Sequence, residues 1–486
     1  MHPSASVHSS PSHPCSTTSK NERIVAWPLF IRLDPVQSKC QRLHMIKTLI
    51  VGAVLTAVAL PGLARGATLH TFKKIQLTPH FWAEGAAAGD FNRDGKMDAV
   101  YGPFWWEGPE FAKRHEYRPA TATFKRKNAA GEEETLPGFE GALGSNNAYS
   151  DNFFTWTWDF NGDGWTDILI VGLPGEEAFW FENPRNKAGH WTRHTAFDIV
   201  DNESPMFDNL VGDAAPELIC NSRGFFGYAM PDPGQPTQPW TFHPVTPNKN
   251  YHKYNHGLGV GDVNGDGRPD LLEKDGWWEQ PASLAGDPVW KHHPYPFSPP
   301  QEGMPVGGAQ MFAYDINGDG LADVITCLAS HGHGLAWYEQ VRESGQITFK
   351  PHIFMNREPA DSPYGVKFTQ PHAFDLVDMD GDGLKDLVTG KRFWAHGPTG
   401  DVDPNAPAVL YWYKLVRGPG RTAEFVPHLI DDNSGVGTQV MAVDMNGDER
   451  PDIVVGNKKG GHVFLQEVKT VSHSEYDAAQ PKRIAR

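Results

Sequence analysis

Six short segments of the sequence carry acidic and amide side chains at a spacing that suits a calcium ion. The segment Asp262–Asp270, DVNGDGRPD, has Asp, Asn, Asp, Gly and Asp at positions 1, 3, 5, 6 and 9. Oxygen ligands at positions 1, 3, 5 and 9, with a backbone carbonyl at 7, form the hard-oxygen cage that Ca²⁺ prefers, and Gly at 6 permits the sharp turn. We therefore expect Ca²⁺ as a structural cofactor, bound in up to six places.

The six loops share the same spacing of residues, so the expected ligands stand at positions 1, 3, 5 and 9 of each loop. The expected calcium ligands are Asp90, Asn92, Asp94, Asp98, Asp159, Asn161, Asp163, Asp167, Asp262, Asn264, Asp266, Asp270, Asp315, Asn317, Asp319, Asp323, Asp378, Asp380, Asp382, Asp386, Asp444, Asn446, Asp448 and Asp452. A degenerate copy at Asn209–Glu217 has the same spacing but lacks most of the ligand residues. An EF-hand is excluded, because no amphipathic helix follows the loops and position 12 is Glu in only one of the six.

The loops recur along the chain as part of a longer repeat. Their spacings are 69, 50, 53, 53, 63 and 66 residues, which gives seven units with the worn copy included. An apolar segment precedes each loop, and a β-type run, an aromatic segment such as GWWEQP and usually a W/F-x-x-H segment follow it. Four short strands repeated seven times predict an all-β fold, a seven-bladed β-propeller with Ca²⁺-binding DxDxDGxxD loops in six blades.

At these motifs the chain resembles the FG-GAP (VCBS-type) repeat propellers, the group that includes the integrin α-subunit head. The resemblance runs from about residue 70 to 470. It implies a closed ring of blades. Thr71–Leu77, TFKKIQL, has the pattern of a fourth strand but precedes the first loop. We expect it to pair into the last blade and remove the free sheet edges.

The two ends of the chain lie outside this repeat. Residues 1–44 have no periodic pattern, and we expect them to be non-structured or to precede the real start at Met45. Residues 45–67 combine a basic start, an apolar run and small residues, which predicts a signal peptide. The propeller is then expected at 68–470, with a C-terminal tail at 471–486. The predicted location is secreted or periplasmic, with no membrane span after cleavage. Cys220 and Cys327 would lie on equivalent strands of blades separated by a third blade, so both are expected to be free and buried.

Charge limits the possible partners. The 486-residue chain has a formal net charge of −16, and residues 1–67 contain seven basic and two acidic residues, so the remainder carries −21. Such a charge argues against nucleic acid as the partner. The expected partners are a glycan or sugar acid, or another protein.

A second set of polar residues is predicted on the face opposite the calcium loops. Strand geometry places residues five or six positions before each loop, and the loops between the second and third strands, at the mouth of the axial channel. The predicted ligand-contacting residues are Glu84, Lys274, Gln310, His331, Lys391 and Gln439, and the predicted catalytic residues are His256, His372 and Arg392. On so acidic a chain, this collection of cations and imidazoles favours an anionic or hydroxyl-rich ligand.

Several functions are compatible with this surface. The first is an extracellular protein that binds or processes carbohydrate; as an enzyme it would be a lyase or dehydratase, with His256 or His372 removing a proton next to a carbonyl and Arg392 stabilising the enolate. The alternatives are a non-catalytic protein-interaction or adhesion scaffold, as integrins suggest, and a structural repeat protein. An insert at 117–150 either covers the channel or is a solvated loop.

Overall fold

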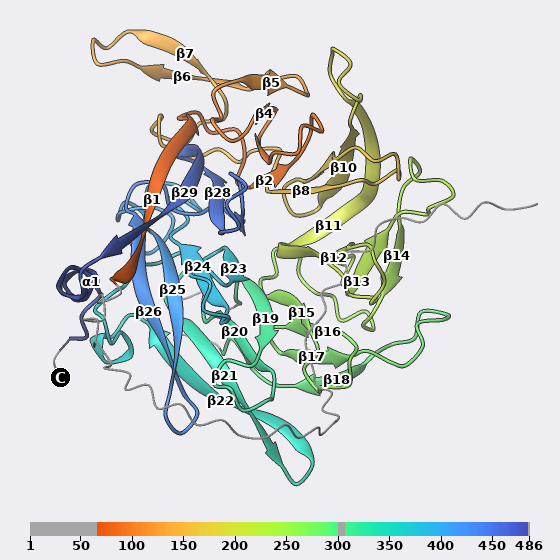
Figure 1. The fold of residues 1–486 in the computed structure, drawn as a ribbon. Coiled ribbons are helices and arrows are strands. Elements are labelled where there is room, and N and C mark those ends of the chain that lie inside the picture. The colour runs from red at the N-terminus through yellow and green to blue at the C-terminus, as the bar shows by residue number, and fades with distance from the viewer. Residues whose placement is uncertain (1–65, 300–306, 485–486) are drawn as a thin grey trace, which may run out of the picture. The chain divides into compact units, whose positions relative to one another are not determined.

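The computed structural model describes residues 66–299 and 307–484, and within them the fold is all-β with a curled succession of sheets (Figure 1). All of these residues belong to one compact unit, Ala64–Arg486. The predicted non-structured start, 1–44, and the predicted signal peptide, 45–67, lie outside the described residues except for Gly66 and Ala67.

The strands follow one another in antiparallel groups of four. The first groups comprise β2 (Ala86–Gly89), β3 (Asp98–Tyr101), β4 (Phe104–Trp106) and β5 (Arg114–Glu116), and then β8 (Phe154–Trp158), β9 (Asp167–Val171), β10 (Glu176–Glu182) and β11 (Thr192–Asp208). Next come β12 (Glu217–Ser222), β13 (Phe225–Met230) and β14 (Thr241–Pro244), which share β11, and β15 (Leu258–Gly261), β16 (Asp270–Glu273), β17 (Gly276–Glu279) and β18 (Lys291–Pro294). The last groups are β19 (Gln310–Tyr314), β20 (Asp323–Cys327), β21 (Leu335–Glu343) and β22 (Gln346–Met355); β23 (Phe374–Val377), β24 (Asp386–Gly390), β25 (Leu410–Gly418) and β26 (Thr422–Asp431); and β27 (Val440–Val443), β28 (Asp452–Asn457) and β29 (Gly460–Val471).

The first strand of the chain completes the last group. Strand β1 (Ala67–Thr78) pairs antiparallel with β29 from Ala67 opposite Val471 to Thr78 opposite Gly461, and the two lie side by side in Figure 1. The prediction for Thr71–Leu77 is therefore confirmed. This pairing joins the two ends of the described chain and covers an edge that β29 would otherwise expose.

Two connections merge neighbouring groups into larger sheets. Strand β11 pairs with β10 through its first half and with β12 through its second half, with a register shift between Asp201 and Met206. Strand β15 pairs in parallel with β19, so their two groups form one eight-stranded sheet. The irregular stretch of β11 contains Glu203, a residue of the site described below.

The aspartate at the ninth position of each acidic loop links the start of its own loop to the third strand of its group, or to the residues just after that strand. Asp270, for example, is fully buried; its Oδ2 accepts a hydrogen bond from Val263 N (2.9 Å) and its Oδ1 one from Gln280 N (2.9 Å). Burial raises the pKa of Asp270 to about 7. The same pair of backbone contacts recurs in all six loops at Asp98, Asp167, Asp270, Asp323, Asp386 and Asp452.

Apolar packing between the sheets uses the aromatic segments of the repeat. Trp105, Trp106, Trp277 and Trp278 are all buried, as expected for packing residues. Cys220 and Cys327 are buried and free, which confirms that prediction. No helix of the described residues is long and apolar enough to cross a membrane.

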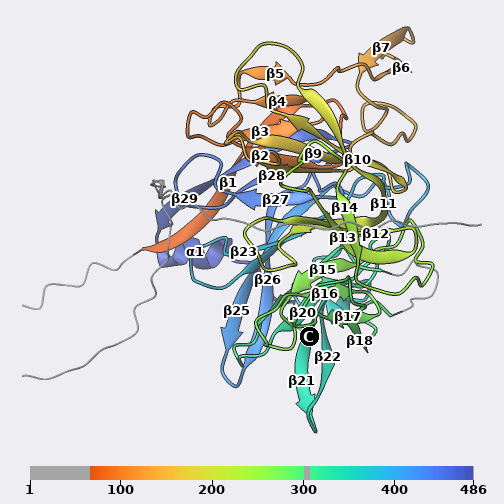
Figure 2. The ribbon, with the colours of Figure 1, turned by 90° about the vertical axis from the view of Figure 1, so that its right-hand side faces the viewer.

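Segments outside the repeat form three small elements. The insert contains a hairpin, β6 (Thr123–Lys127) and β7 (Glu133–Pro137), which stands apart from the other sheets in Figure 2. A 3₁₀ helix, η1, spans Pro359–Asp361. Beyond β29, within the predicted tail, Ser472 caps the helix α1 (His473–Ala479).

Candidate functional site

The predicted catalytic residues lie at the strand ends remote from the acidic loops. His256 lies two residues before β15, His372 two residues before β23, and Arg392 two residues after β24. His331 occupies the turn between β20 and β21, and Glu84 precedes β2. Since a loop such as Asp262–Asp270 begins where β15 ends, the length of that strand separates the two regions.

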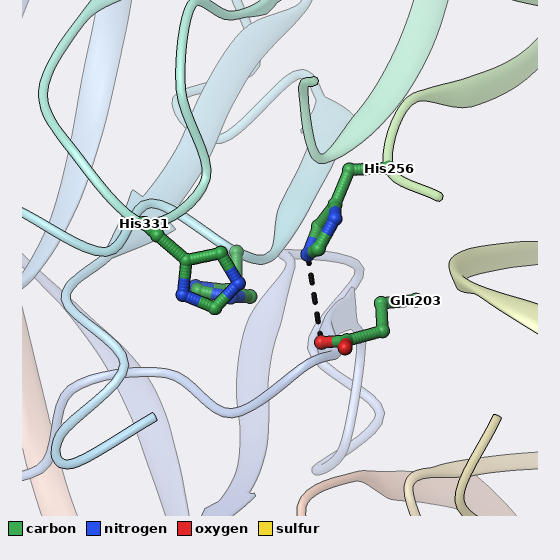
Figure 3. Close-up of side chains that lie close together, drawn as sticks. Glu203, His256 and His331 are labelled. Carbon is green, nitrogen blue, oxygen red and sulfur yellow. Dashed lines mark hydrogen bonds and ion pairs between the residues drawn. The ribbon is translucent and has the colours of Figure 1, made fainter. Parts of the chain in front are cut away.

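Three imidazoles and one carboxylate meet in a buried cluster, which we call the histidine cluster: Glu203, His256, His331 and His372. Glu203 Oε2 lies 3.5 Å from His256 Nε2, the contact drawn in Figure 3. His372 Nε2 lies 3.4 Å from His331 Nε2. All four side chains are buried, and one ligand atom from each lies within 4.8 Å of the others. These four residues come from four separate groups of strands.

An ion-pair network adjoins the histidine cluster. Arg392 is 1% exposed; its Nε donates to Glu84 Oε2 at 3.2 Å, and its Nη1 lies 3.5 Å from Glu203 Oε2. Lys458 Nζ lies 3.6 Å from Glu84 Oε1. Nη2 of Arg392 has no hydrogen-bond partner within the described ranges. Two carboxylates and two cations thus balance in charge, but the guanidinium keeps a donor free.

Backbone contacts around Gln370 hold three of these loops together. Gln370 N donates to Gly332 O (3.0 Å), its Nε2 donates to His331 O (3.0 Å), and its O accepts from Arg392 N (2.9 Å). Gln370 has φ of 64°, a left-handed conformation that side-chain-bearing residues adopt at a cost. The loops carrying His331, His372 and Arg392 are therefore fixed to one another through a single strained residue.

A glycine fixes the position of His256. Gly307 has φ of 117°, and a Cβ placed there would lie 2.7 Å from His256 Cβ. Only glycine permits this approach without displacing the imidazole. On the other side, Glu203 N donates to Asn255 O at 2.8 Å, which ties the irregular part of β11 to the segment before β15.

A cavity of about 370 Å³ opens beside the histidine cluster. Its lining consists of Tyr149, Phe153, Leu173, Glu203, His252, Tyr254, His256, His331, Arg392, Ala395 and His396. His372 is not among these residues, and its ring packs against that of His331 at 4.4 Å between centroids. Tyr149 comes from the end of the insert, so the insert contributes to the lining while its hairpin stands away from the other sheets.

Asp401 lies between two histidines of the cavity lining, His396 and His331. His396, whose side chain is 45% exposed, has its Nδ1 2.7 Å from Asp401 Oδ1. The same Asp401 oxygen lies 3.4 Å from His331 Nδ1. Asp401 therefore orients the ring of His396 and faces that of His331, and Nε2 of His396 is the ring nitrogen that the contact with Asp401 does not use.

Burial controls the ionisation of the site. It lowers the pKa of His331 to about 4 and that of His372 well below its usual value, so both rings are neutral at pH 7. Burial opposes ionisation of Glu203, but the neighbouring His256 and Arg392 lower its pKa to about 2. Burial also lowers the pKa of Lys458 to about 8. The cluster thus combines the neutral imidazoles of His331 and His372 with the ionised carboxylate of Glu203.

Four predicted residues have other contacts. Gln310 Oε1 accepts from Phe374 N (2.9 Å), and Gln439 spans to Thr155 N and O, so these amides brace neighbouring inner strands. Both line a different cavity, of about 290 Å³. Lys391 Nζ donates to Thr369 Oγ1 at 2.6 Å. Lys274 pairs with the exposed Asp275 and does not line the cavity beside the cluster.

Sequence reasoning missed Glu203, His396, Asp401 and Tyr149. Glu203 stands six residues before Asn209, the same position that Glu84, His256 and His372 hold before their own loops. The signal was therefore present, although its loop had lost most ligand types. His396, Asp401 and Tyr149 belong to irregular segments that carry no repeat frame.

One of the six acidic loops brings three carboxylates close together. In the loop that starts at Asp378, the carboxylate oxygens of Asp378, Asp380 and Asp382 lie within 4.8 Å of one another. Lys414 Nζ contacts Asp380 and lies 2.9 Å from Asp382 Oδ2. This gathering of negative charge is compatible with a bound cation.

Comparisons with known proteins identify the repeat. Residues 315–389 match the family model described as an FG-GAP-like repeat. The segment contains β20, β23 and two of the acidic loops. The chain therefore carries an FG-GAP-like repeat, as its motifs predicted.

Solved structures give weaker likenesses. Rhamnogalacturonan lyase YesW is 11% identical, with 82% of this chain and 72% of that one covered and a TM-score of 0.34. The exotype rhamnogalacturonan lyase YesX is 12% identical, with 83% and 75% covered and a TM-score of 0.35. The Tc holotoxin pore of Photorhabdus luminescens is 17% identical over 71% of this chain but only 16% of the toxin chain, with a TM-score of 0.31. Likenesses of this strength carry no argument about what this chain binds.

Proposed function

We propose that the protein is an exported, calcium-stabilised, seven-bladed β-propeller that binds or processes an anionic or keto-sugar carbohydrate in the cavity beside Arg392. The groups of four strands, with β1 completing the last, would be its blades. The signal-like segment 45–67 supports export. The six acidic loops support Ca²⁺ binding, and six divalent ions would reduce a net charge of −21 to −9.

The observation that carries the ligand proposal is the buried, incompletely paired guanidinium of Arg392. A buried donor without a partner costs about 1–3 kcal/mol, which a ligand oxygen would recover. Arg392 lines the cavity, and its Nη2 has no partner among the residues described. A carboxylate or carbonyl oxygen would accept from it, and Tyr149 and Tyr254 would stack against sugar rings.

The same arrangement supports proton abstraction next to a carbonyl. His396 would act as the base, because Asp401 holds its Nδ1 and leaves Nε2 for the substrate. As the C–H bond breaks, the electron pair moves onto the carbonyl oxygen, and Arg392 stabilises the resulting enolate. Loss of a β-oxygen substituent, which takes up a proton, would then complete an elimination. His256 lies within reach of the ligand, whereas His372 would act only through His331.

The test is ligand-dependent stabilisation of the mature chain in Ca²⁺. Neutral sugars, uronic acids and keto-sugars would be screened by thermal shift, and absorbance near 235 nm would report any new conjugated double bond. Arg392→Met should abolish stabilisation by an anionic or keto-sugar ligand. Arg223→Met, which removes an exposed arginine paired with Asp198, is the matched control and should keep it.

The outcomes separate the hypotheses. Stabilisation with rising absorbance supports an eliminating enzyme, and stabilisation alone supports a binding protein. Stabilisation that survives Arg392→Met, or no response to any sugar, would overturn the proposal and favour a protein partner instead.

A further inference from the structure

The histidine cluster has the spacing of a metal-ligand set. Four ligands placed tetrahedrally about 2.1 Å from an ion are separated by about 3.4 Å. The two closest contacts, His256 Nε2 to Glu203 Oε2 and His331 Nε2 to His372 Nε2, measure 3.5 and 3.4 Å. The four ligand atoms together fall within 4.8 Å. A small contraction would complete a tetrahedral arrangement or one face of a larger coordination sphere.

Hydrogen bonding within the protein does not account for this arrangement. His256 Nε2 has no hydrogen-bond partner in the described parts of the chain, and its distance to Glu203 is long for one. Two imidazole nitrogens face each other at His331 and His372, although a neutral ring pair shares at most one proton there. Polar atoms buried in this way are costly unless a further group binds them.

The surroundings of the cluster also suit a metal ion. Asp401 Oδ1 lies 3.4 Å from His331 Nδ1, which has no hydrogen-bond partner among the described residues. With the small contraction proposed above, this carboxylate would hold the proton on Nδ1 and leave Nε2 as the ligand atom. Arg392 Nη1 lies 3.5 Å from Glu203 Oε2 and orients that carboxylate. Gly307 and Gln370 fix the backbones that carry the imidazoles, as described above. Ligand orientation by such neighbours is characteristic of protein metal sites.

We propose that Glu203, His256, His331 and His372 bind one divalent first-row transition-metal ion. Three imidazoles and one carboxylate favour ions such as Zn²⁺, Co²⁺ or Fe²⁺ over Ca²⁺ and Mg²⁺, which prefer oxygen ligands. The chain would therefore hold two chemically distinct kinds of metal site. The acidic loops would take hard cations at one set of strand ends, and the histidine cluster would take a softer cation at the other.

The metal would also define how a ligand binds. Glu203, His256 and His331 line the cavity, so a remaining coordination position would face it. Glu84 and Glu203 balance Arg392 and Lys458, and a divalent ion would add two positive charges to this neutral group. If the proposed function holds, the ion and Arg392 would bind adjacent carbonyl, carboxylate or hydroxyl oxygens of the substrate.

Cobalt titration tests the metal site without any sugar. The mature chain would be stripped with chelator, saturated with millimolar Ca²⁺ to occupy the acidic loops, and titrated with Co²⁺. One equivalent should bind and produce visible absorption bands in the 500–650 nm region, which Ca²⁺ cannot produce, and Zn²⁺ should displace it. No binding above the level of the Ca²⁺-saturated loops would overturn the proposal, whatever the sugar screen shows.

Variants assign the ligands. His256→Asn, His331→Asn and His372→Asn should each weaken Co²⁺ binding at least tenfold and alter the bands, and Asp401→Asn should weaken it about 10- to 100-fold as a supporting group. His352→Asn is the matched control: His352 is paired with Glu339 and stacked on Trp337, and its loss should leave the titration unchanged. Melting curves in Ca²⁺ would check that every variant is folded. Unchanged affinity in folded His331→Asn would contradict the assignment.

Discussion

The outer strands and the histidine cluster both contain partly or fully buried imidazoles, but the two sets differ in what their rings contact. On the outer strands each ring stacks on an aromatic residue of the neighbouring strand; His293 on Trp277 has 4.0 Å between centroids and 5° between planes. Its Nε2 also lies 2.7 Å from Glu279. The pattern recurs at His115, His194 and His352.

In the histidine cluster the rings of His256 and His372 lack such a pair of partners. His331 does stack on His396, at 4.4 Å between centroids, but its Nδ1 lies 3.4 Å from Asp401, farther than the carboxylate contacts of the outer strands. The rings of His256, His331 and His372 contact one another edge-on, and several of their nitrogens have no hydrogen-bond partner among the described residues. The four outer-strand rings named above thus have their ring stacked and one nitrogen paired, whereas the rings that meet where the strand groups converge leave several nitrogens unpaired. Residue type alone does not mark a site; an unmet hydrogen-bonding requirement in a buried place does.

The largest change in melting temperature should come from removing Ca²⁺. This tests whether the outer strands and the histidine cluster both depend on a fold that Ca²⁺ stabilises. A ligand present at a hundred times its Kd stabilises the folded state by about 2.7 kcal/mol per site, and the proposal has six sites. We expect chelation to lower the melting temperature by at least about 10 °C. Differential scanning calorimetry would measure it.

Readdition of Ca²⁺ should restore the melting temperature, whereas Zn²⁺ alone should not, because imidazoles rather than carboxylates suit it. An unchanged melting temperature after chelation would remove the calcium interpretation of the loops. The proposal for the histidine cluster would stand or fall separately on the cobalt titration.

The second prediction compares how much stability is lost when a buried ion pair and a partly exposed one are removed. Arg392→Met removes the guanidinium that pairs with both Glu84 and Glu203 and leaves Lys458 beside Glu84. Breaking a buried pair costs about 3–5 kcal/mol. Glu339→Gln removes the half-exposed partner of His352 and should cost less than about 1 kcal/mol. Urea denaturation in Ca²⁺ gives both free energies of unfolding. Equal losses would mean that the site is no more sensitive to charge than the outer strands.

The repeat frame explains how much of this could be predicted. Loop spacing, aromatic segments and the strand-like Thr71–Leu77 predicted the strand groups and the pairing of β1 with β29, because each is a local pattern. The frame also identified Glu84, His256 and His372, which share one position before their loops. The prediction grouped them with Gln310 and Gln439, one residue further along, although side chains of adjacent strand residues point in opposite directions. Those two amides contact neighbouring strands instead.

The remaining site residues depend on tertiary structure. His396 and Asp401 come together through an irregular loop after β24, and Tyr149 reaches the cavity from an insert between two strand groups. No periodic pattern fixes such positions. Glu203 was missed for a different reason. The loop that follows it, Asn209–Glu217, lacks most calcium ligands, but Glu203 still stands six residues before that loop, as Glu84, His256 and His372 do before theirs.

The smallest effect concerns His428, an outer-strand imidazole that, like His292, lacks the carboxylate hydrogen bond of the four rings named above. It stacks on Trp412 at 4.5 Å, but its buried Nε2 lacks a hydrogen-bond partner within the described residues. Burial, with the nearby Lys414 and His70 charges, lowers its pKa from 6.5 to about 4. Between those pH values the unfolded chain binds a proton that the folded chain does not, so stability is full above about pH 6.5 and falls as the pH is lowered towards 4.

His428→Phe should keep the stacking and remove this proton linkage. The variant should lose less stability than the wild type when the pH falls from 7.5 to 5.5, by about 1 kcal/mol at the lower pH. Urea denaturation at the two pH values in saturating Ca²⁺ measures the difference. His352→Phe, which replaces a ring already paired with Glu339, is the control and should not flatten the pH dependence in this way. If the stabilities of wild type and His428→Phe change equally with pH, the unpaired ring nitrogen of His428 has no effect on its protonation. The same criterion, a buried ring nitrogen without a hydrogen-bond partner, would then be weaker evidence for the histidine cluster.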